Sequence, residues 1–233
     1  MKWSIKMKFL VTPSLALLLA IGCFAADTPA PEAGFVSLFD GKTLDGWRVG
    51  ENANVFQVRD GMIVMEYPAT DHGPAHLFYV GSVAGHDFKN FDLRVEVMTF
   101  PGANSGIYFH TKFQEADWPK CGLECQVDNS HSDWRRTGSL YGIRNISWVP
   151  KPPVTDNVWY TQEVVCQDGL LTVKLDGQAV IEYRLPNADV EHKLPTGMTW
   201  LPRGTFALQG HPPMRAHGSK ACFKNIRVKV LPD

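Results

Sequence analysis

The sequence has no large excess of charge of either sign, and it lacks the motifs of several common enzyme classes. Its 233 residues include 23 Lys and Arg against 24 Asp and Glu. A nucleic-acid partner is therefore not expected, because phosphate binding requires a basic surface. It contains no Gly-x-Ser-x-Gly elbow, phosphate-binding loop or His-Glu-x-x-His pair, which argues against α/β-hydrolases, P-loop enzymes and zincin proteases. Long helical apolar patterns are also missing beyond the first 25 residues, which disfavours an α-helical fold.

Residues 1–25 are predicted to be an export signal. Three lysines precede a mostly apolar run from Phe9 to Phe24, and small residues follow at Ala25 and Ala26. The run is interrupted by polar residues and proline, and it is too short to indicate a membrane-spanning helix. Without this segment, which takes three lysines and no acidic residue, 20 basic side chains face 24 acidic ones, a formal net charge of −4.

Two endings of the signal remain open. Cleavage after Ala25 would release a free protein, whereas the segment that ends in Cys23 resembles a bacterial lipoprotein box. Either ending predicts an exported protein, periplasmic or extracellular, and a membrane is a partner only if Cys23 is lipidated. Residues 26–34 are expected to form a flexible leader, and residues 35–233 a single domain without a convincing internal linker.

The rest of the sequence has the pattern of short antiparallel strands. Residues 91–97 alternate between apolar and polar side chains with a period of two. Asp-Gly pairs at positions 60–61, 168–169 and 176–177 separate strand-like runs, as in hairpins with two-residue turns. About a dozen short strands over roughly 200 residues predict an all-β fold, an antiparallel β-sandwich or jelly roll.

Four cysteines follow the predicted signal, at positions 121, 125, 166 and 222. An even number in an exported protein permits two disulfides, although we expect at most one to include Cys121 or Cys125. The Cys-x3-Cys spacing occurs in some metal sites, but no second Cys or His pair follows at zinc-finger spacing. Buried free thiols remain the alternative.

Three of the expected strands have one apolar face and one face rich in hydrogen-bonding groups. The polar side chains are, strand by strand, Asn104, Tyr108 and His110, then Glu124, Gln126 and Asp128, then Gln209 and His211. If these strands are neighbours in one sheet, the groups line one concave surface that suits a polyhydroxylated ligand. The alternative is an ordinary solvated sheet face, on which such side chains are inert.

At these residues the sequence resembles the 3-keto-disaccharide hydrolase family. The matching segments are, in order, Phe39–Trp47, Phe91–Glu96, Asn104–His110, Gly122–Asn129, Thr137–Gly142, Leu208–His211 and Phe223–Val228. The resemblance extends over residues 35–231 and implies a concanavalin-like jelly roll with an activity on sugars oxidised at carbon 3. The segment His76–His86 and the Gln-Gly-His-Pro-Pro ending from Gln209 depart from the family pattern, and they concern substrate choice and the rim of the site.

The implied reaction depends on the acidity that a ketone at carbon 3 gives to the hydrogen at carbon 2. A general base removes that proton, β-elimination expels the group at carbon 1, and water adds afterwards. The negative oxygen of the enediolate requires a stabilising group, and the leaving group requires an acid.

The polar residues supply candidates for each role. Glu124 is a candidate base, and His110 and His211 are candidates for proton transfer. Carboxylate and neutral imidazole also suit a zinc-like ion, so a divalent cation held by His110, Glu124 and His211 is expected. Arg144 is a candidate for steadying an anionic oxygen. The full set of expected substrate-binding residues is Asn104, Tyr108, Gln126, Asp128, Tyr141, Arg144 and Gln209.

Two other functions fit the same fold. A carbohydrate-binding module without chemistry would use the same polar surface, and Trp134, Trp148 and Trp159 would provide a stacking platform for a sugar in either case. A structural sandwich with a partner-binding face is the third possibility, because fold alone does not determine function. The expected partner in the first two cases is an oligosaccharide or another glycoside.

Overall fold

The computed structural model describes residues 32–67, 73–147, 154–213 and 218–233. Ala33–Asp233 form one compact unit. The predicted export signal and Trp148 lie outside the described residues. Within the described ranges, none of the helices has the length and apolar character needed to cross a membrane.

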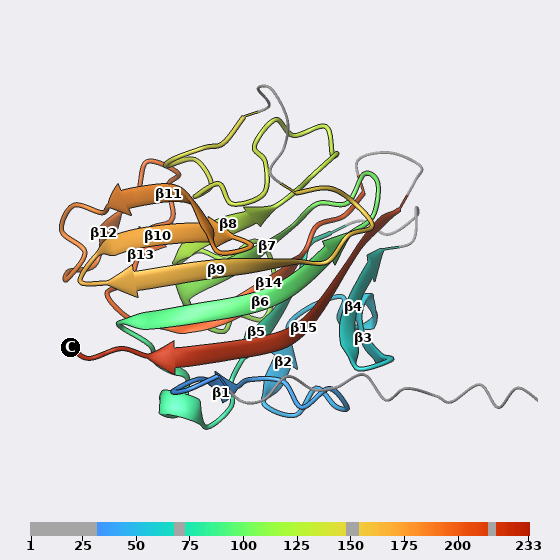
Figure 1. Ribbon diagram of the computed structural model, residues 1–233, viewed down its shortest axis with the longest axis horizontal. Helices are drawn as coiled ribbons and strands as arrows, with labels where there is room; N and C mark the ends of the chain where they lie inside the picture. The colour runs from blue at the N-terminus through green and yellow to red at the C-terminus, as the bar shows by residue number, and fades with distance from the viewer. Residues whose placement is uncertain (1–31, 68–72, 148–153, 214–217) are drawn as a thin grey trace, which may run out of the picture. The chain divides into compact units, whose positions relative to one another are not determined.

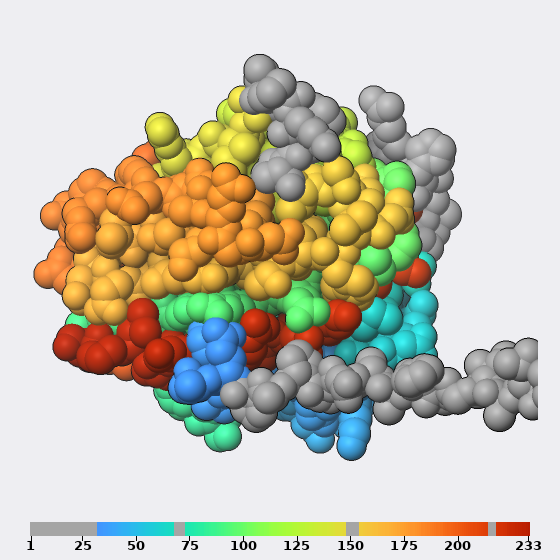
Figure 2. Space-filling model, in the orientation of Figure 1, coloured from blue at the N-terminus to red at the C-terminus, as the bar shows by residue number. Residues whose placement is uncertain are grey.

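Two antiparallel sheets face each other, and a small two-stranded sheet lies beside them (Figure 1). The strands of the larger sheet follow the order β11-β10-β9-β6-β15-β4-β3, with β1 paired to β15. Their bounds are β1 Val36–Ser37, β3 Phe56–Arg59, β4 Met62–Tyr67, β6 Phe91–Thr99, β9 Tyr160–Gln167, β10 Leu170–Leu175, β11 Gln178–Arg184 and β15 Ser219–Val230. The space-filling view shows the outer face of this sheet. Its upper part is formed by β10 and β11, in orange, and by the yellow connection that precedes β9 (Figure 2).

The smaller sheet has the order β2-β5-β14-β7-β8. Its strands are β2 Trp47–Val49, β5 Ala75–Tyr79, β7 Ser105–Thr111, β8 Leu123–Val127 and β14 Thr205–Gly210. The remaining elements are the pair β12 His192–Lys193 and β13 Thr199–Trp200, and the short 3-10 helices η1 Ala53–Val55 and η2 Val83–His86. The all-β antiparallel sandwich predicted from the sequence is confirmed.

The three predicted Asp-Gly hairpins are present, as β3–β4, β9–β10 and β10–β11. Asp60, Asp168 and Asp176 have positive φ angles of 50°, 48° and 49°, and the glycine after each has one of 75° to 78°. Two consecutive positive φ angles define the turn whose twist matches that of the flanking strands. The Asp-Gly pairs therefore set the register next to each turn, and in β10–β11 a bulge between Lys174 and Val173 then shifts it by one residue.

The alternation in the smaller sheet places its apolar side chains between the two sheets. Leu123, Cys125 and Val127 of β8 are fully buried in one apolar cluster. Ile107 and Phe109 of β7 join the same cluster, together with Phe206 and Leu208 of β14. The face predicted for each of these residues is confirmed, so their neighbours on the same strands point to the outer face of the sheet.

A β-bulge in β7 interrupts this alternation at His110. Thr111 pairs with Thr205 of β14 while Tyr108 pairs with Ala207, so two residues of β7 oppose Phe206 alone. His110 has a φ angle of 52°, which accommodates the extra residue. Because a one-residue slip moves side chains to the opposite face, His110 turns inward. The prediction that His110 shares a face with Tyr108 is wrong.

Strand β8 is last in the order of the smaller sheet, yet its outer edge is covered by backbone. The amide of Gly138 donates to the carbonyl oxygen of Gln126 at 3.0 Å, and the amide of Tyr141 donates to that of Glu124 at 2.9 Å. The connection from β8 to β9 thus folds back along β8, and Figure 1 shows it at the top of the view.

All four cysteines after the predicted signal are buried and unpaired. The disulfides that their even number permits are not formed, and the alternative of buried thiols is the one the structure has. Burial raises the pKa of both Cys125 and Cys166 to about 12, so these thiols stay protonated at neutral pH.

Candidate active site

A cavity of about 250 Å³ lies on the outer face of the smaller sheet. Its lining residues come from β7, β8 and β14 and from the surrounding loops. They are Asn104, Tyr108, Trp118, Pro119, Glu124, Gln126, Asp133, Tyr141, Thr196, Met198, Gln209 and His211. Seven of the ten residues predicted from the sequence are among them, and three, His110, Asp128 and Arg144, are not.

Strand pairing explains why these residues meet. Tyr108 of β7 is paired with Glu124 of β8, and Gly106 of β7 is paired with Gln126. Gly106 has no side chain, and a Cβ there would overlap Oε1 of Glu124. The Glu124 side chain therefore crosses the floor of the cavity above Gly106 and reaches Gln209 on β14.

Three side chains donate hydrogen bonds to the carboxyl group of Glu124. The Tyr108 hydroxyl donates to Oε2 at 2.9 Å, and Nε2 of Gln209 donates to Oε1 at 2.8 Å. The Gln126 amide donates to Oε1 at 3.1 Å when its nitrogen faces this oxygen and the carbonyl of Ser105. Burial outweighs these bonds and raises the pKa of Glu124 to about 8. The carboxyl therefore holds a proton at neutral pH, and its pKa is close enough to neutral pH for the group to give up and regain that proton during a reaction.

His211 follows β14 and faces the same cavity. Its Nδ1 lies 2.7 Å from the carbonyl oxygen of Pro212, which can only accept, so Nδ1 carries the hydrogen and Nε2 carries the lone pair. The ring packs between Trp118 and His131, at centroid distances of 5.2 and 5.7 Å. Burial lowers the pKa of His211. A neutral imidazole with one free nitrogen thus faces the cavity that contains Glu124.

A third group of side chains lies on the connection from β8 to β9. Nη1 of Arg135 donates to both carboxylate oxygens of Asp133, at 3.1 and 3.0 Å, and to the hydroxyl of Tyr141 at 3.2 Å. The guanidinium carbon also lies 4.4 Å from the centre of the Tyr141 ring. This cation polarises the Tyr141 hydroxyl, and the Tyr141 side chain lines the cavity.

Arg135, and not Arg144, is the cation near the cavity. Arg144 is exposed, and its backbone pairs with Leu140 in the turn that follows Tyr141. The structure therefore does not place Arg144 in the lining of the cavity, where it was expected to steady an anionic oxygen. Arg135 has no distinctive spacing in the sequence, and it reaches Tyr141 only because residues 137–141 fold back along β8.

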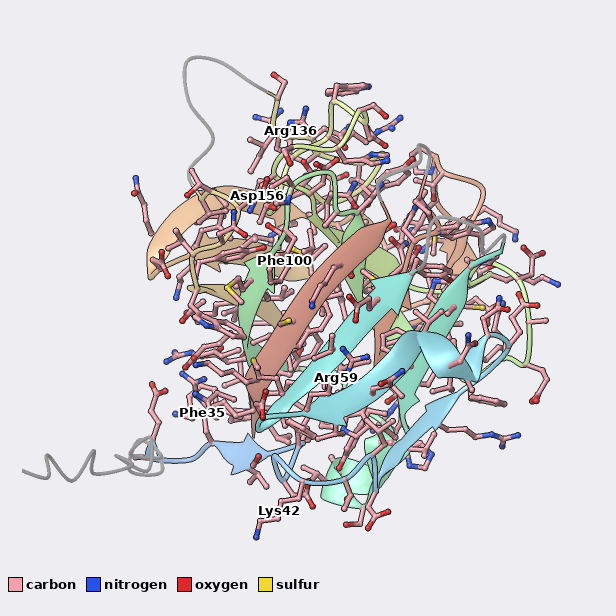
Figure 3. The ribbon with its side chains drawn as sticks, turned by 90° about the vertical axis from the view of Figure 1, so that its right-hand side faces the viewer. Phe35, Lys42, Arg59, Phe100, Arg136 and Asp156 are labelled. Carbon is pink, nitrogen blue, oxygen red and sulfur yellow. The ribbon has the colours of Figure 1, made fainter. Side chains whose placement is uncertain are left out.

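Asp128 is buried away from the cavity. Its Oδ1 accepts a hydrogen bond from Nη1 of Arg136 at 2.8 Å and another from the amide of His131 at 2.9 Å. Figure 3 shows Arg136 at the loop end of the sandwich, above Asp156. Asp128 therefore anchors the start of the β8–β9 connection, and it does not line the cavity in which it was predicted to contact a sugar hydroxyl.

His110 is buried beside two backbone carbonyls, and its ring donates to only one of them, because burial lowers the pKa of His110 to about 4 and keeps the ring neutral. Its Nδ1 lies 2.8 Å from the oxygen of Leu201, and its Nε2 lies 3.0 Å from that of Lys89. The ring packs on Trp200 at a centroid distance of 4.4 Å. These contacts give His110 a structural position, and it does not line the cavity in which its catalytic role was predicted.

The predicted metal site consequently loses one of its three ligands. Glu124 and His211 line the cavity without His110. In the part of the chain that the structure describes, no group of three or more His, Cys, Asp or Glu side chains is placed to hold a metal ion. The residues present do not fit the expected three-ligand cation, and no chemical step is derived through one.

Of the three tryptophans expected as a platform, the structure describes Trp134 and Trp159, which pack against two different cations, Arg135 and Lys224. Trp159 packs beneath the ammonium group of Lys224 of the larger sheet, 4.2 Å from its ring centre, and Trp148 lies outside the described residues. Trp134 is on the β8–β9 connection and is 52% exposed. Trp118, which lines the cavity, was missed because it lies in a loop with no periodic pattern.

Comparison with known proteins identifies the family. A model described as the 3-keto-alpha-glucoside-1,2-lyase-like domain matches residues 34–229. The chain belongs to this family. A curated relative, the 3-keto-disaccharide hydrolase of Bacteroides thetaiotaomicron, is 27% identical over 87% of this chain and 80% of its own length. The resemblance seen in the sequence is confirmed.

Solved structures share the fold of this 3-keto-alpha-glucoside-1,2-lyase-like domain. A proposed glycosyl hydrolase from Parabacteroides distasonis has a TM-score of 0.66 and 22% identity, over 85% of this chain and 94% of that one. The carbohydrate binding module CBM66 from Bacillus subtilis has a TM-score of 0.51 and 13% identity, over 79% and 95%. At these identities the likeness establishes the sandwich fold alone.

Proposed function

We propose that this protein is an exported enzyme that cleaves the bond between carbon 1 and the leaving-group oxygen of 3-keto-glycosides. One observation carries the proposal: a carboxyl group of raised pKa, Glu124, and an imidazole of lowered pKa, His211, line one cavity. Groups whose pKa values are displaced in this way are suited to acid and base roles at one pH. The family match and the name of the Bacteroides relative support a keto sugar as the substrate.

The two groups take opposite roles in the elimination. His211 is neutral, and its Nε2 accepts the proton from carbon 2 of the substrate, which the adjacent ketone makes acidic. The electron pair of that C–H bond forms the carbon 1–carbon 2 double bond, and the bond from carbon 1 to oxygen breaks. Glu124, protonated at neutral pH, gives its proton to the departing oxygen. The products are a free alcohol or sugar and an unsaturated keto sugar.

Hydration reverses the same proton transfers. The oxygen of a water molecule bonds to carbon 1 while the Glu124 carboxylate accepts a proton from that water. The His211 imidazolium then returns a proton to carbon 2. The sum of both steps is hydrolysis, and both side chains regain their starting states. Glu124 was expected from the sequence to be the base. It is instead proposed to be the acid, because burial keeps it protonated.

The cavity also contains groups suited to the developing charge and to hydroxyls. The Tyr141 hydroxyl, polarised by Arg135, donates to the ketone oxygen as negative charge develops there. Asn104 and Gln209 each have a buried side-chain oxygen without a hydrogen-bond partner among the described residues. Sugar hydroxyl groups would satisfy these two acceptors on binding.

The decisive experiment compares a 3-keto-disaccharide with its unoxidised parent. We expect sugar release from the keto form only, and incorporation of deuterium at carbon 2 in heavy water. Glu124→Gln should slow release of the leaving group more than deuterium exchange, while His211→Gln should suppress both. Equal release from the unoxidised parent would refute the keto mechanism. Binding of the keto form without turnover would favour the carbohydrate-binding module.

Export through residues 1–25 is the second part of the proposal, and it rests on the lysines, apolar run and small residues of that segment. N-terminal sequencing and intact mass of the protein made in its native host test it. A chain that starts at Ala26 supports free secretion, and a lipid-bearing Cys23 supports anchoring. A full-length chain in the cytoplasm would contradict export.

A further inference from the structure

The cavity is small for a disaccharide. Its volume of about 250 Å³ lies below the range of roughly 300–1,000 Å³ that is usual for pockets that enclose drug-sized ligands. Because Glu124 and Gln209 form the polar floor of the cavity, the ring that reacts with Glu124 must occupy the cavity. The group attached to carbon 1 must then extend past the rim.

On the β8–β9 connection a stack of side chains leads outward from the cavity. Tyr141 lines the cavity, and the guanidinium of Arg135 lies 4.4 Å from its ring centre. The same guanidinium lies 5.1 Å from the ring centre of Trp134. Trp134 follows Asp133, itself a lining residue, so the stack runs from the wall to the protein surface.

Trp134 has the character of a binding platform. It is 52% exposed, although a large aromatic side chain on a surface normally gains from burial. The cation beneath it restrains its ring, and Arg135 is itself held by Asp133 through two hydrogen bonds. A restrained, exposed aromatic ring beside a polar cavity suits the apolar face of a sugar.

We propose that Trp134 is the platform for the leaving group, on which the second pyranose ring of a disaccharide stacks while the keto ring occupies the cavity. The assignment of the two rings rests on the proposed function. It predicts that Trp134 strengthens the binding of substrates with a second sugar ring and has no effect on the binding of substrates with a small leaving group.

The test compares two substrates that share the 3-keto-glucosyl group, a disaccharide and a methyl glycoside. Trp134→Ala should lower kcat/KM for the disaccharide roughly 5- to 10-fold and leave the methyl glycoside unchanged. Trp134→Phe should restore most of the loss. Trp159→Ala is the matched control, because Trp159 also packs against a cation but lies against the larger sheet, and it should alter neither substrate.

Calorimetric binding to Glu124→Gln protein, with and without Trp134→Ala, keeps the test independent of turnover. A loss of affinity for the disaccharide alone supports the platform, even if the wild type proves inactive. Inactivity of the wild type would overturn only the proposed function. An equal loss for both ligands would show that Trp134 acts by positioning Arg135 and would overturn the platform. Unchanged values for both ligands would overturn it too.

Discussion

Replacement of Glu124 by Gln should stabilise the fold, and the gain should grow with pH. The introduced amide would copy the shape of the protonated carboxyl but would never ionise. The native pKa of about 8 is well above the ordinary value of 4.5 that we take for the unfolded chain. Below about pH 4.5 Glu124 is protonated in both states and burial costs little. Between the two values the unfolded chain loses its proton while the native state retains it, so wild-type stability falls.

The size of the effect follows from the same two values. The two pKa values differ by about 3.5, and each pKa unit corresponds to ~1.36 kcal/mol. Above pH 8 the variant should therefore be more stable than the wild type by at most about 5 kcal/mol. At pH 7 the corresponding limit is about 3 kcal/mol. His211 titrates in both proteins, so the difference between wild type and variant isolates Glu124.

Urea unfolding followed by tryptophan fluorescence, at steps from about pH 5 to pH 9 with a reductant present, measures this difference. Glu163→Gln is the matched control. Glu163 is also buried, but it is paired with Lys174 at 2.6 Å and Arg94 at 3.5 Å, so its replacement should destabilise the fold at neutral pH. A difference between Glu124→Gln and wild type that stays flat over this range would refute the argument that burial raises the pKa of Glu124.

Three further predictions concern the floor, the core and the thiols. Gly106→Ala should displace the Glu124 carboxyl and lower kcat at least about tenfold while the protein still melts cooperatively, since the clash is with the end of a side chain; unchanged kcat would contradict the need for an empty floor. His110→Asn keeps a residue that tolerates positive φ but loses both carbonyl contacts, so it should lower the free energy of unfolding by about 2–4 kcal/mol with kcat retained below its melting temperature; lost activity in the folded variant would reinstate a catalytic role. Alkylation followed by intact mass should modify the four buried cysteines only after unfolding and without prior reduction, and a thiol revealed only by reductant would indicate a disulfide; the four are Cys121, Cys125, Cys166 and Cys222.

The fold was predictable because its signals are local. Asp-Gly pairs such as Asp60-Gly61 set hairpin registers within a few residues, and period-two alternation separated Leu123 from Glu124 correctly. His110 shows the limit of that rule. A bulge is defined by the pairing of β7 with β14, more than 90 residues away, and a single strand read alone gives no sign of it.

The site was predictable where it depends on strand faces and unpredictable where it depends on loops. Glu124, Tyr108 and Gln209 meet because their strands are neighbours. Trp118 lines the cavity and Arg135 contacts the lining residue Tyr141, and both come from irregular segments whose course is set by tertiary contacts. Sequence alone therefore identified the floor of the cavity, but it pointed to Arg144, whereas Arg135 is the arginine that contacts Tyr141.

The backbone that folds along the edge of β8 has a consequence for how such a protein can change. Glu124 belongs to a strand whose neighbours on both sides fix it, β7 by the sheet and residues 138–141 by their amides. Beyond those anchors, the connection that carries Trp134 is surface chain, where insertions and substitutions are best tolerated. Descendants of this protein could thus exchange one leaving group for another by altering the rim, while Glu124, the proposed acid, keeps its position in the sheet.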